Sequence, residues 1–156
     1  MEDLTKQYIQ FKLGEQDYVI EMLYVREIIK PVEITKLLGS PNFVQGVTKL
    51  RDKVLTIISL HKKFKIMNLV KGEPRIIIFE FGNEKIGLIV DEVVEIIETN
   101  HIEKIPSFIH HGIIHKLIKL QDNIIPILDV EILFSNEVAT WLNLEENEAV
   151  SNLKLR

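Results

Sequence analysis

The residues best suited to metal chemistry in this sequence are the histidines of the segment His110-His-Gly-Ile-Ile-His115. His111 and His115 are four residues apart, and on a helix that spacing places two imidazoles on one face, where they could hold zinc. No neighbouring carboxylate or cysteine completes the set of ligands, and a glycine and two isoleucines interrupt the segment. A metal- or ligand-binding β-barrel regulator that uses His110, His111 and His115 or a groove therefore stays an alternative, and the sequence itself predicts no cofactor.

Acid–base and nucleophilic catalysis have weaker candidates. Asp91, Glu92 and Glu95 are acidic neighbours that could exchange protons, but such a cluster is more typical of a solvated turn beside a strand. His61 begins the basic run His61-Lys-Lys63 and is expected at a solvated strand end, although an imidazole could accept a phosphoryl group. No serine lies in a Gly-x-Ser-x-Gly context, and no glycine-rich phosphate loop occurs. The sequence therefore predicts a binding module and no enzyme.

The chain is organised by an internal repeat. Residues 48–60 align with residues 118–130, and nearly every apolar position in one segment is matched by an apolar residue in the other. Upstream, Phe11-Lys-Leu-Gly14 aligns with Phe79-Glu-Phe-Gly82 at an offset of 68 residues. Chance similarity between isoleucine-rich strands is the alternative, but the glycine, proline and phenylalanine positions agree as well. The identical pairs in the first alignment are Lys49/Lys119, Leu50/Leu120, Asp52/Asp122 and Ile57/Ile127.

The repeat predicts one domain with two subdomains, at about residues 8–66 and 76–134. Turn residues recur every 8 to 12 positions and separate about ten short apolar runs, five in each copy. That pattern favours small β-barrels over a parallel sheet with crossing helices. Because barrels of this size have thin cores, we expect them to pack together and to leave a groove at their seam.

Local signals place several elements within this plan. A β-hairpin is expected over residues 7–21 with the four-residue loop Gly14-Glu-Gln-Asp17, and a second hairpin turns across Gly82-Asn83. Residues 22–29 are predicted to form a short helical turn that continues as a strand. A short C-terminal helix is predicted at about residues 136–146, with Ser135 as its N-cap.

Composition excludes several classes of partner. The 156 residues are 46% apolar and 27% charged, with a net charge of −4, which is typical of a soluble globular protein without a nucleic-acid partner. No run of 18 apolar residues could cross a bilayer, and no secretory signal is seen, so we expect a cytoplasmic protein without direct membrane insertion. The absence of cysteine excludes disulfides and thiolate chemistry.

The repeat also exposes an asymmetry in charge. Arg51 aligns with Gln121, whereas Glu27 aligns with Glu95, so the fold does not require a cation at position 51. We expect Glu27 and Arg51 to lie close together, with the carboxylate holding the guanidinium as an oriented surface feature. The alternative is an ordinary surface ion pair with little effect on stability.

Several motifs together resemble those of CheW-domain proteins, the coupling proteins of bacterial chemotaxis. They are Val25-Arg-Glu-Ile-Ile29, Pro41-Asn-Phe-Val-Gln-Gly-Val47, Leu50-Arg51, Gly87-Leu-Ile-Val-Asp-Glu-Val93 and Ile124-Ile-Pro-Ile-Leu-Asp-Val130. No single motif is decisive, but their order and spacing are specific together. The resemblance covers residues 8 to about 134.

The resemblance implies a mainly β protein with two five-stranded SH3-like barrels and a hydrophobic groove between them. It implies a non-catalytic adaptor of two-component signalling that couples chemoreceptor cytoplasmic tips, those of methyl-accepting chemotaxis proteins, to the regulatory domain of the histidine kinase CheA. Such an adaptor is recruited to membrane-bound receptor arrays. The resemblance assigns receptor contact to Val25, Glu27 and Arg51 and places Ile76 and Ile77 at the groove.

The sequence departs from the family pattern in two motifs, Lys49-Leu-Arg-Asp52 and Thr56-Ile-Ile-Ser-Leu60. Lys49 stands where the family usually has asparagine, and Thr56 stands where it usually has proline. Asp52 stands where the family usually has glycine, and Ser59 stands where it usually has aspartate. Glycine adopts positive φ cheaply, while aspartate does so at some cost, so the turn after Arg51 is expected to differ. The second copy keeps the family's proline and aspartate at Pro126 and Asp129.

Overall fold

The computed structural model describes residues 5–68, 71–106 and 112–134. The helix predicted at 136–146 lies outside the described residues. Within them the chain is almost entirely β. The elements are β1 (Lys6–Leu13), β2 (Gln16–Glu21), the 3-10 helix η1 (Met22–Tyr24), β3 (Val25–Ile29), β4 (Val44–Leu50), β5 (Lys53–Ile58), α1 (Leu60–Phe64), β6 (Arg75–Phe81), β7 (Glu84–Val90), β8 (Glu92–Thr99), β9 (Ile102–Lys104), β10 (Lys116–Lys119), β11 (Ile124–Ile127) and α2 (Val130–Ile132).

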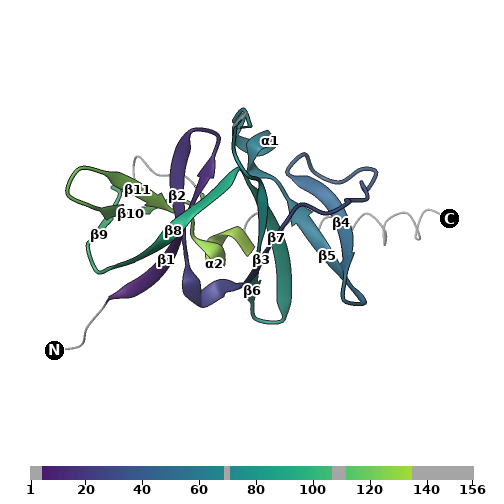
Figure 1. The fold of residues 1–156 in the computed structure, drawn as a ribbon, viewed down its shortest axis with the longest axis horizontal. Helices are drawn as coiled ribbons and strands as arrows, with labels where there is room; N and C mark the ends of the chain where they lie inside the picture. The colour runs from purple at the N-terminus through teal and green to yellow at the C-terminus, as the bar shows by residue number, and fades with distance from the viewer. Residues whose placement is uncertain (1–4, 69–70, 107–111, 135–156) are drawn as a thin grey trace, which may run out of the picture.

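The strands form two sheets, which appear as two lobes in Figure 1. One sheet has six strands in the order β8-β1-β2-β11-β10-β9, and the other has five in the order β3-β6-β7-β5-β4. The short helix α2 lies between the lobes in this view. The predicted class, mainly β with two SH3-like subdomains, is confirmed. Five strands were expected in each sheet, and β9 is the sixth strand of the larger one.

The two sheets have the same connectivity once the repeat is applied. Strands β8, β1, β2, β11 and β10 of one sheet correspond to β3, β6, β7, β5 and β4 of the other, in that order. The parallel pairing of Ile57 with Gly87 is reproduced by Ile127 with Val19, at the positions that the repeat predicts. This agreement supports the duplication as a property of the fold.

Each copy gives its leading hairpin to the sheet of the other copy. The hairpin of β1 and β2 pairs with β8 and β11, and the hairpin of β6 and β7 pairs with β3 and β5. The predicted bounds 8–66 and 76–134 therefore describe the sequence repeat but do not coincide with the two sheets. Periodicity within a strand cannot report which distant strand will pair with it.

Local predictions are accurate at two turns and differ at one. The helical turn that continues as a strand is present as η1 and β3, and β6 and β7 turn through Gly82 and Asn83. The first hairpin has two loop residues instead of four, because Leu13 pairs with Gln16. Gly14 makes the tighter turn possible, since its φ of 64° lies in the left-handed region that favours glycine.

One apolar core fills the space between the sheets. Phe11 and Ile20 of the six-stranded sheet belong to the same buried cluster as Ile77 and Phe79 of the five-stranded sheet. Phe134, which follows α2, packs edge-on against Phe79 with ring centroids 5.6 Å apart. Because this core unites the sheets, their relative position is fixed by burial rather than by the short connections.

Candidate interaction surface

The turn between β4 and β5 positions Arg51. Arg51 and Asp52 both have positive φ, 48° and 66°, and Leu50 pairs with Lys53 to close a two-residue loop. A loop of this length needs two left-handed residues, and each residue other than glycine pays about 1 kcal/mol or more for that conformation. The conformational cost expected at Asp52 is therefore present. Arg51 carries the same cost, which was not predicted.

The guanidinium of Arg51 forms a two-point ion pair with Glu27. Nη1 and Nη2 of Arg51 donate to the two carboxylate oxygens of Glu27 at 2.9 and 2.8 Å. The hydrogen bonds from Arg51 lower the pKa of Glu27, and those to Glu27 raise the pKa of Arg51. The side chain of Arg51 is still 73% exposed. The pair is thus rigidly oriented and accessible, as the sequence predicts.

A second ion pair lies beside the first. Nε of Arg26 donates to Glu80 at 2.7 Å, which joins the edge strand β3 to β6. This hydrogen bond is the main reason that the pKa of Glu80 is lowered. The register of β3 against β6 shifts between Val25 and Glu27, so the alternation of faces is interrupted there, and Arg26 and Glu27 line the same groove while each has its own partner. The edge of the five-stranded sheet is therefore tied down at both residues.

These side chains border a groove of about 460 Å³. Leu55 and Ile78 are buried side chains at its apolar surface, and Val54 is 75% exposed beside them. Every lining residue belongs to the five-stranded sheet or its turns, so this groove does not lie at the seam between subdomains, where the sequence analysis expected one. The shared core occupies the seam instead. The lining residues are Arg26, Glu27, Leu50, Arg51, Lys53, Val54, Leu55, Ile78, Asn83 and Lys85.

The other residues assigned by resemblance lie in or against the core. Val25 is half-buried and packs on the largest cluster. Ile76 and Ile77 are 2% and 0% exposed, so the prediction that they line an accessible groove is wrong. The strand β6 is covered on both faces, and its continuous apolar run in the sequence is the signal of that double burial. Of the five predicted contact residues, the structure brings Glu27 and Arg51 together at the surface.

A buried polar cluster occupies the junction of the two sheets and was not predicted. Nε2 of His61 lies 2.7 Å from Oδ2 of Asp91, and Nδ1 lies 3.2 Å from the hydroxyl of Ser59. The backbone N–H of Gly14 also donates to Asp91, at 2.5 Å. All three side chains are buried, at 6% exposure or less. The predictions of a solvated strand end at His61 and a solvated turn at Asp91 are therefore wrong.

The reason for that error is tertiary. His61 and Asp91 are 30 residues apart, and each looks solvated beside its charged neighbours Lys62 and Glu92. The exchanged hairpins bring them together: β7 pairs with β5, which places Asp91 beside His61, and the turn at Gly14 donates to Asp91. The cluster has a Ser–His–Asp composition, but burial denies a substrate access to the hydroxyl, so its role is structural.

The histidine segment is described only in part. His110 and His111 lie outside the described residues. His115 places Nε2 at 2.5 Å from Oδ2 of Asp129, and Oδ1 of Asp129 accepts the backbone N–H of Ile132 as the N-cap of α2. His115 thus contributes to the start of α2. Within residues 5–68, 71–106 and 112–134, no group of three or more histidines and carboxylates is placed to hold a metal ion.

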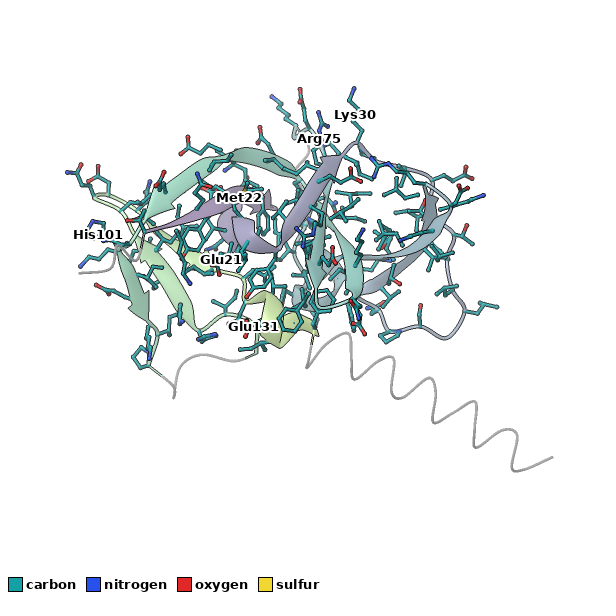
Figure 2. The ribbon with its side chains drawn as sticks, turned by 90° about the horizontal axis from the view of Figure 1, so that it is seen from below. Glu21, Met22, Lys30, Arg75, His101 and Glu131 are labelled. Carbon is teal, nitrogen blue, oxygen red and sulfur yellow. The ribbon has the colours of Figure 1, made fainter. Side chains whose placement is uncertain are left out.

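A smaller hollow of about 200 Å³ lies over the six-stranded sheet near α2. The hydroxyl of Tyr24 donates to Glu131 at 2.9 Å and links η1 to α2. Figure 2 shows Glu21 between Met22 and Glu131 near the middle of the molecule, whereas His101 lies at the far end of its lobe. Burial and then the bond to Glu131 raise the pKa of Tyr24. This hollow is predominantly polar in its lining and less suited to an apolar partner.

No helix among the described residues has the length and apolar character needed to span a membrane.

The chain matches a family model and several known proteins over most of its length. The model described as "CheW-like domain" matches residues 7–138. The chemotaxis protein CheW of Treponema pallidum is 28% identical over 141 residues, covering 84% of this chain and 83% of that protein. The one of Klebsiella aerogenes is 29% identical over 142 residues, covering 87% and 86%.

A solved structure has the same fold. The crystal structure of the scaffolding protein TtCheW from Thermoanaerobacter tengcongensis superposes with a TM-score of 0.75 at 35% sequence identity. The comparison covers 85% of this chain and 90% of that one. The similarity therefore extends over both sheets.

Proposed function

Since the chain belongs to the CheW-like domain family, we propose that it is a non-catalytic adaptor of bacterial chemotaxis. It couples the cytoplasmic tips of chemoreceptors to a CheA-type histidine kinase in a cytoplasmic signalling array. The resemblance of the motifs and the names of the relatives support this assignment. The partners themselves are the part of the proposal that experiment must establish.

The observation that carries the receptor side of the proposal is the pair of Glu27 and Arg51. Their two-point contact orients a guanidinium that stays largely exposed, beside a groove of mixed polar and apolar lining in which Val54 is open to solvent. A receptor tip is a helical hairpin, and a helix laid in such a groove buries its apolar face while polar groups on the rim fix its orientation. Each contact is weak, and the array supplies many of them at once.

Isothermal titration calorimetry tests both partners separately. The full chain is titrated with the regulatory domain of a CheA-type kinase and with a receptor cytoplasmic tip fragment, both encoded in the same genome. We expect saturable binding to each, with a negative heat-capacity change from buried apolar surface. A folded chain that binds neither partner would overturn the proposal and leave only the family assignment.

A further inference from the structure

We propose that the segment that docks in the groove beside Arg51 is an acidic helix, and that Lys53 and Lys85 select it. The inference rests on the proposed function, because it names the chemistry of the partner at the same surface. It concerns two residues that neither the family motifs nor the Glu27–Arg51 pair includes.

The first argument is the charge of the groove. Four cations, Arg26, Arg51, Lys53 and Lys85, meet two carboxylates, Glu27 in the lining and Glu80 behind Arg26, which leaves two positive charges in excess. The arginines are engaged by these carboxylates. Lys53 and Lys85 are exposed, and in the part of the chain that the structure describes neither forms an ion pair. The excess charge of the groove therefore belongs to the lysines.

The second argument is that both lysines stand on the face that carries the apolar surface. Gly87 faces Leu55 and Ile57, since a side chain there would meet both. Lys85 is two residues before Gly87 in β7, and Lys53 is two residues before Leu55 in β5, so alternation puts both lysines on this same face. Leu55 and Ile57 are themselves 5% and 0% exposed, so the apolar lining residue most open to a partner beside the cations is Val54, at 75%.

The spacing of the lysines fits one turn or two of a helix. Thr56 pairs with Ile86 in the parallel strands β5 and β7. Lys85 is therefore level with Leu55, and Lys53 lies two residues nearer the start of the strands. A rise of about 3.3 Å per residue and a strand separation of about 4.8 Å put their Cα atoms ~8 Å apart. Carboxylates at positions i and i+4 of a helix are about 6 Å apart, and those at i and i+7 about 10 Å apart. Lysine side chains are long enough to reach either pair.

The repeat provides an internal control for this charge. The equivalent surface of the six-stranded sheet has one cation, Lys12, and three carboxylates, Glu15, Asp17 and Glu95, so its excess is two negative charges. The same fold therefore forms when the net charge of this surface has the opposite sign, so packing does not require lysine at positions 53 and 85. The equivalences are Arg26 with Val94, Arg51 with Gln121, Lys53 with Asn123, Asn83 with Glu15, Lys85 with Asp17, Glu27 with Glu95 and Glu80 with Lys12.

The field of the lysines reaches the carboxylates of the groove. Lys85 contributes to the lowered pKa of Glu27, and both lysines contribute to that of Glu80. These lysines therefore share the electrostatic environment of the two ion pairs. A partner carboxylate entering the groove would meet this field in a partly desolvated setting, where it is less screened than in open water.

The test uses two designed helical peptides of about 20 residues that carry a central leucine. In one peptide glutamates stand three residues before and four residues after the leucine, which makes them i and i+7, and in the other peptide lysines take those positions. Binding to the full chain is measured by fluorescence anisotropy at about 50 mM salt, where exposed charges act most strongly. The acidic peptide should bind at least tenfold more tightly than the basic one.

Two matched variants complete the test. Lys53→Gln with Lys85→Gln should weaken binding of the acidic peptide about tenfold. Lys62→Gln with Lys104→Gln removes the same charge from exposed positions on α1 and β9 and should change it less than twofold. Equal binding of both peptides, no binding of the acidic peptide, or equal loss in both variants would overturn the inference. Since no receptor or kinase takes part, these outcomes are independent of the calorimetric test of the proposed function.

Discussion

The carboxylate of Asp91 accepts a hydrogen bond from Nε2 of His61 at 2.7 Å. Both side chains lie inside the protein and are 4% exposed. A carboxylate only accepts hydrogen bonds, so Nε2 carries the proton and, in the neutral ring, Nδ1 accepts from Ser59. Gly14 and Asn68 donate to the same carboxylate. Asp91 therefore joins the first hairpin, the segment after β5 and the start of β8, which come from both copies of the repeat.

Loss of this carboxylate should destabilise the whole molecule. Asp91→Asn keeps the size of the side chain but turns an amide N–H₂ toward groups that are themselves donors. We expect the free energy of unfolding to fall by about 2–4 kcal/mol, which lowers the melting temperature by about 5–15 °C. Thermal melting followed by circular dichroism measures the change.

Ser59→Ala is the matched control, because it removes the outermost member of the same cluster and leaves Asp91 with its donors. Its cost should stay at or below about 1.5 kcal/mol, the range of one hydrogen bond. An Asp91→Asn protein that melts within 2 °C of the parent would show that the cluster does not hold the sheets together.

Arg51→Lys should impair partner binding almost as much as Arg51→Ala. Lysine keeps the charge but cannot donate two parallel hydrogen bonds to Glu27, so the orientation of the side chain is lost. Because the pair is exposed, the melting temperature should change by no more than about 2 °C. Arg75→Ala serves as the control. Arg75 is the first residue of β6 and does not line the groove, so this variant should bind normally. Calorimetry with the receptor tip fragment reads out binding, and full binding by Arg51→Lys would refute the importance of the two-point contact.

Asp52→Gly should stabilise the protein, whereas Asp122→Gly should not. Asp52 has a φ of 66°, which glycine adopts without the side-chain penalty. The free energy of unfolding should rise by about 0.5–1 kcal/mol. This is the conformational penalty that glycine avoids, reduced by the greater entropy of glycine in the unfolded chain. Asp122 is its equivalent in the repeat but lies in a longer loop without positive φ. Chemical denaturation distinguishes the two, and equal effects would contradict the strained turn at position 52.

The tyrosines should ionise only at high pH. Burial is the largest cause that raises the pKa of Tyr8, Tyr18 and Tyr24 above the ordinary value of 10.0, and Glu131 adds to the effect at Tyr24. Because the folded pKa is the higher one, the stability that Tyr24 contributes is complete below pH 10 and is lost as pH rises through the folded pKa.

Absorbance at 295 nm measures this ionisation directly. The titration should begin above pH 10 for all three tyrosines. Tyr24→Phe should remove the step that occurs at the highest pH. The stability of Tyr24→Phe should also fall less steeply than that of the parent above pH 10. Normal ionisation of Tyr24 near pH 10 would mean that its hydroxyl does not stay bonded to Glu131.

Much of this structure could be predicted from the chain alone, because local signals and the repeat agree. The glycine of the second hairpin, the helical turn before β3 and the pair of Glu27 with Arg51 follow from residue types and from the comparison of the copies. Groups that become neighbours only through hairpin exchange could not be predicted. His61 and Asp91 look solvated in the sequence, and Ile76 and Ile77 were placed at the groove by the family resemblance alone.

The location of the groove shows the same limit. The expectation of a groove at the seam assumed that each copy folds into its own barrel. Because the hairpins are exchanged, Phe11 and Phe79 meet in one core and fill that space. The open groove lies instead where the turn of Arg51 and Asp52 stands above Val54 and Leu55. The sequence identifies the residues of the surface but not the concavity that they border.

The most direct test of the adaptor function is a bridging assay with three components. A receptor cytoplasmic fragment is attached to lipid vesicles, and a CheA-type kinase from the same genome is added with and without this chain. Sedimentation of the vesicles should carry the kinase down several-fold more when the chain is present, and Arg51→Ala should abolish that increase. Kinase that sediments equally with and without the chain, while the chain remains folded, would contradict the proposed coupling of receptor to kinase.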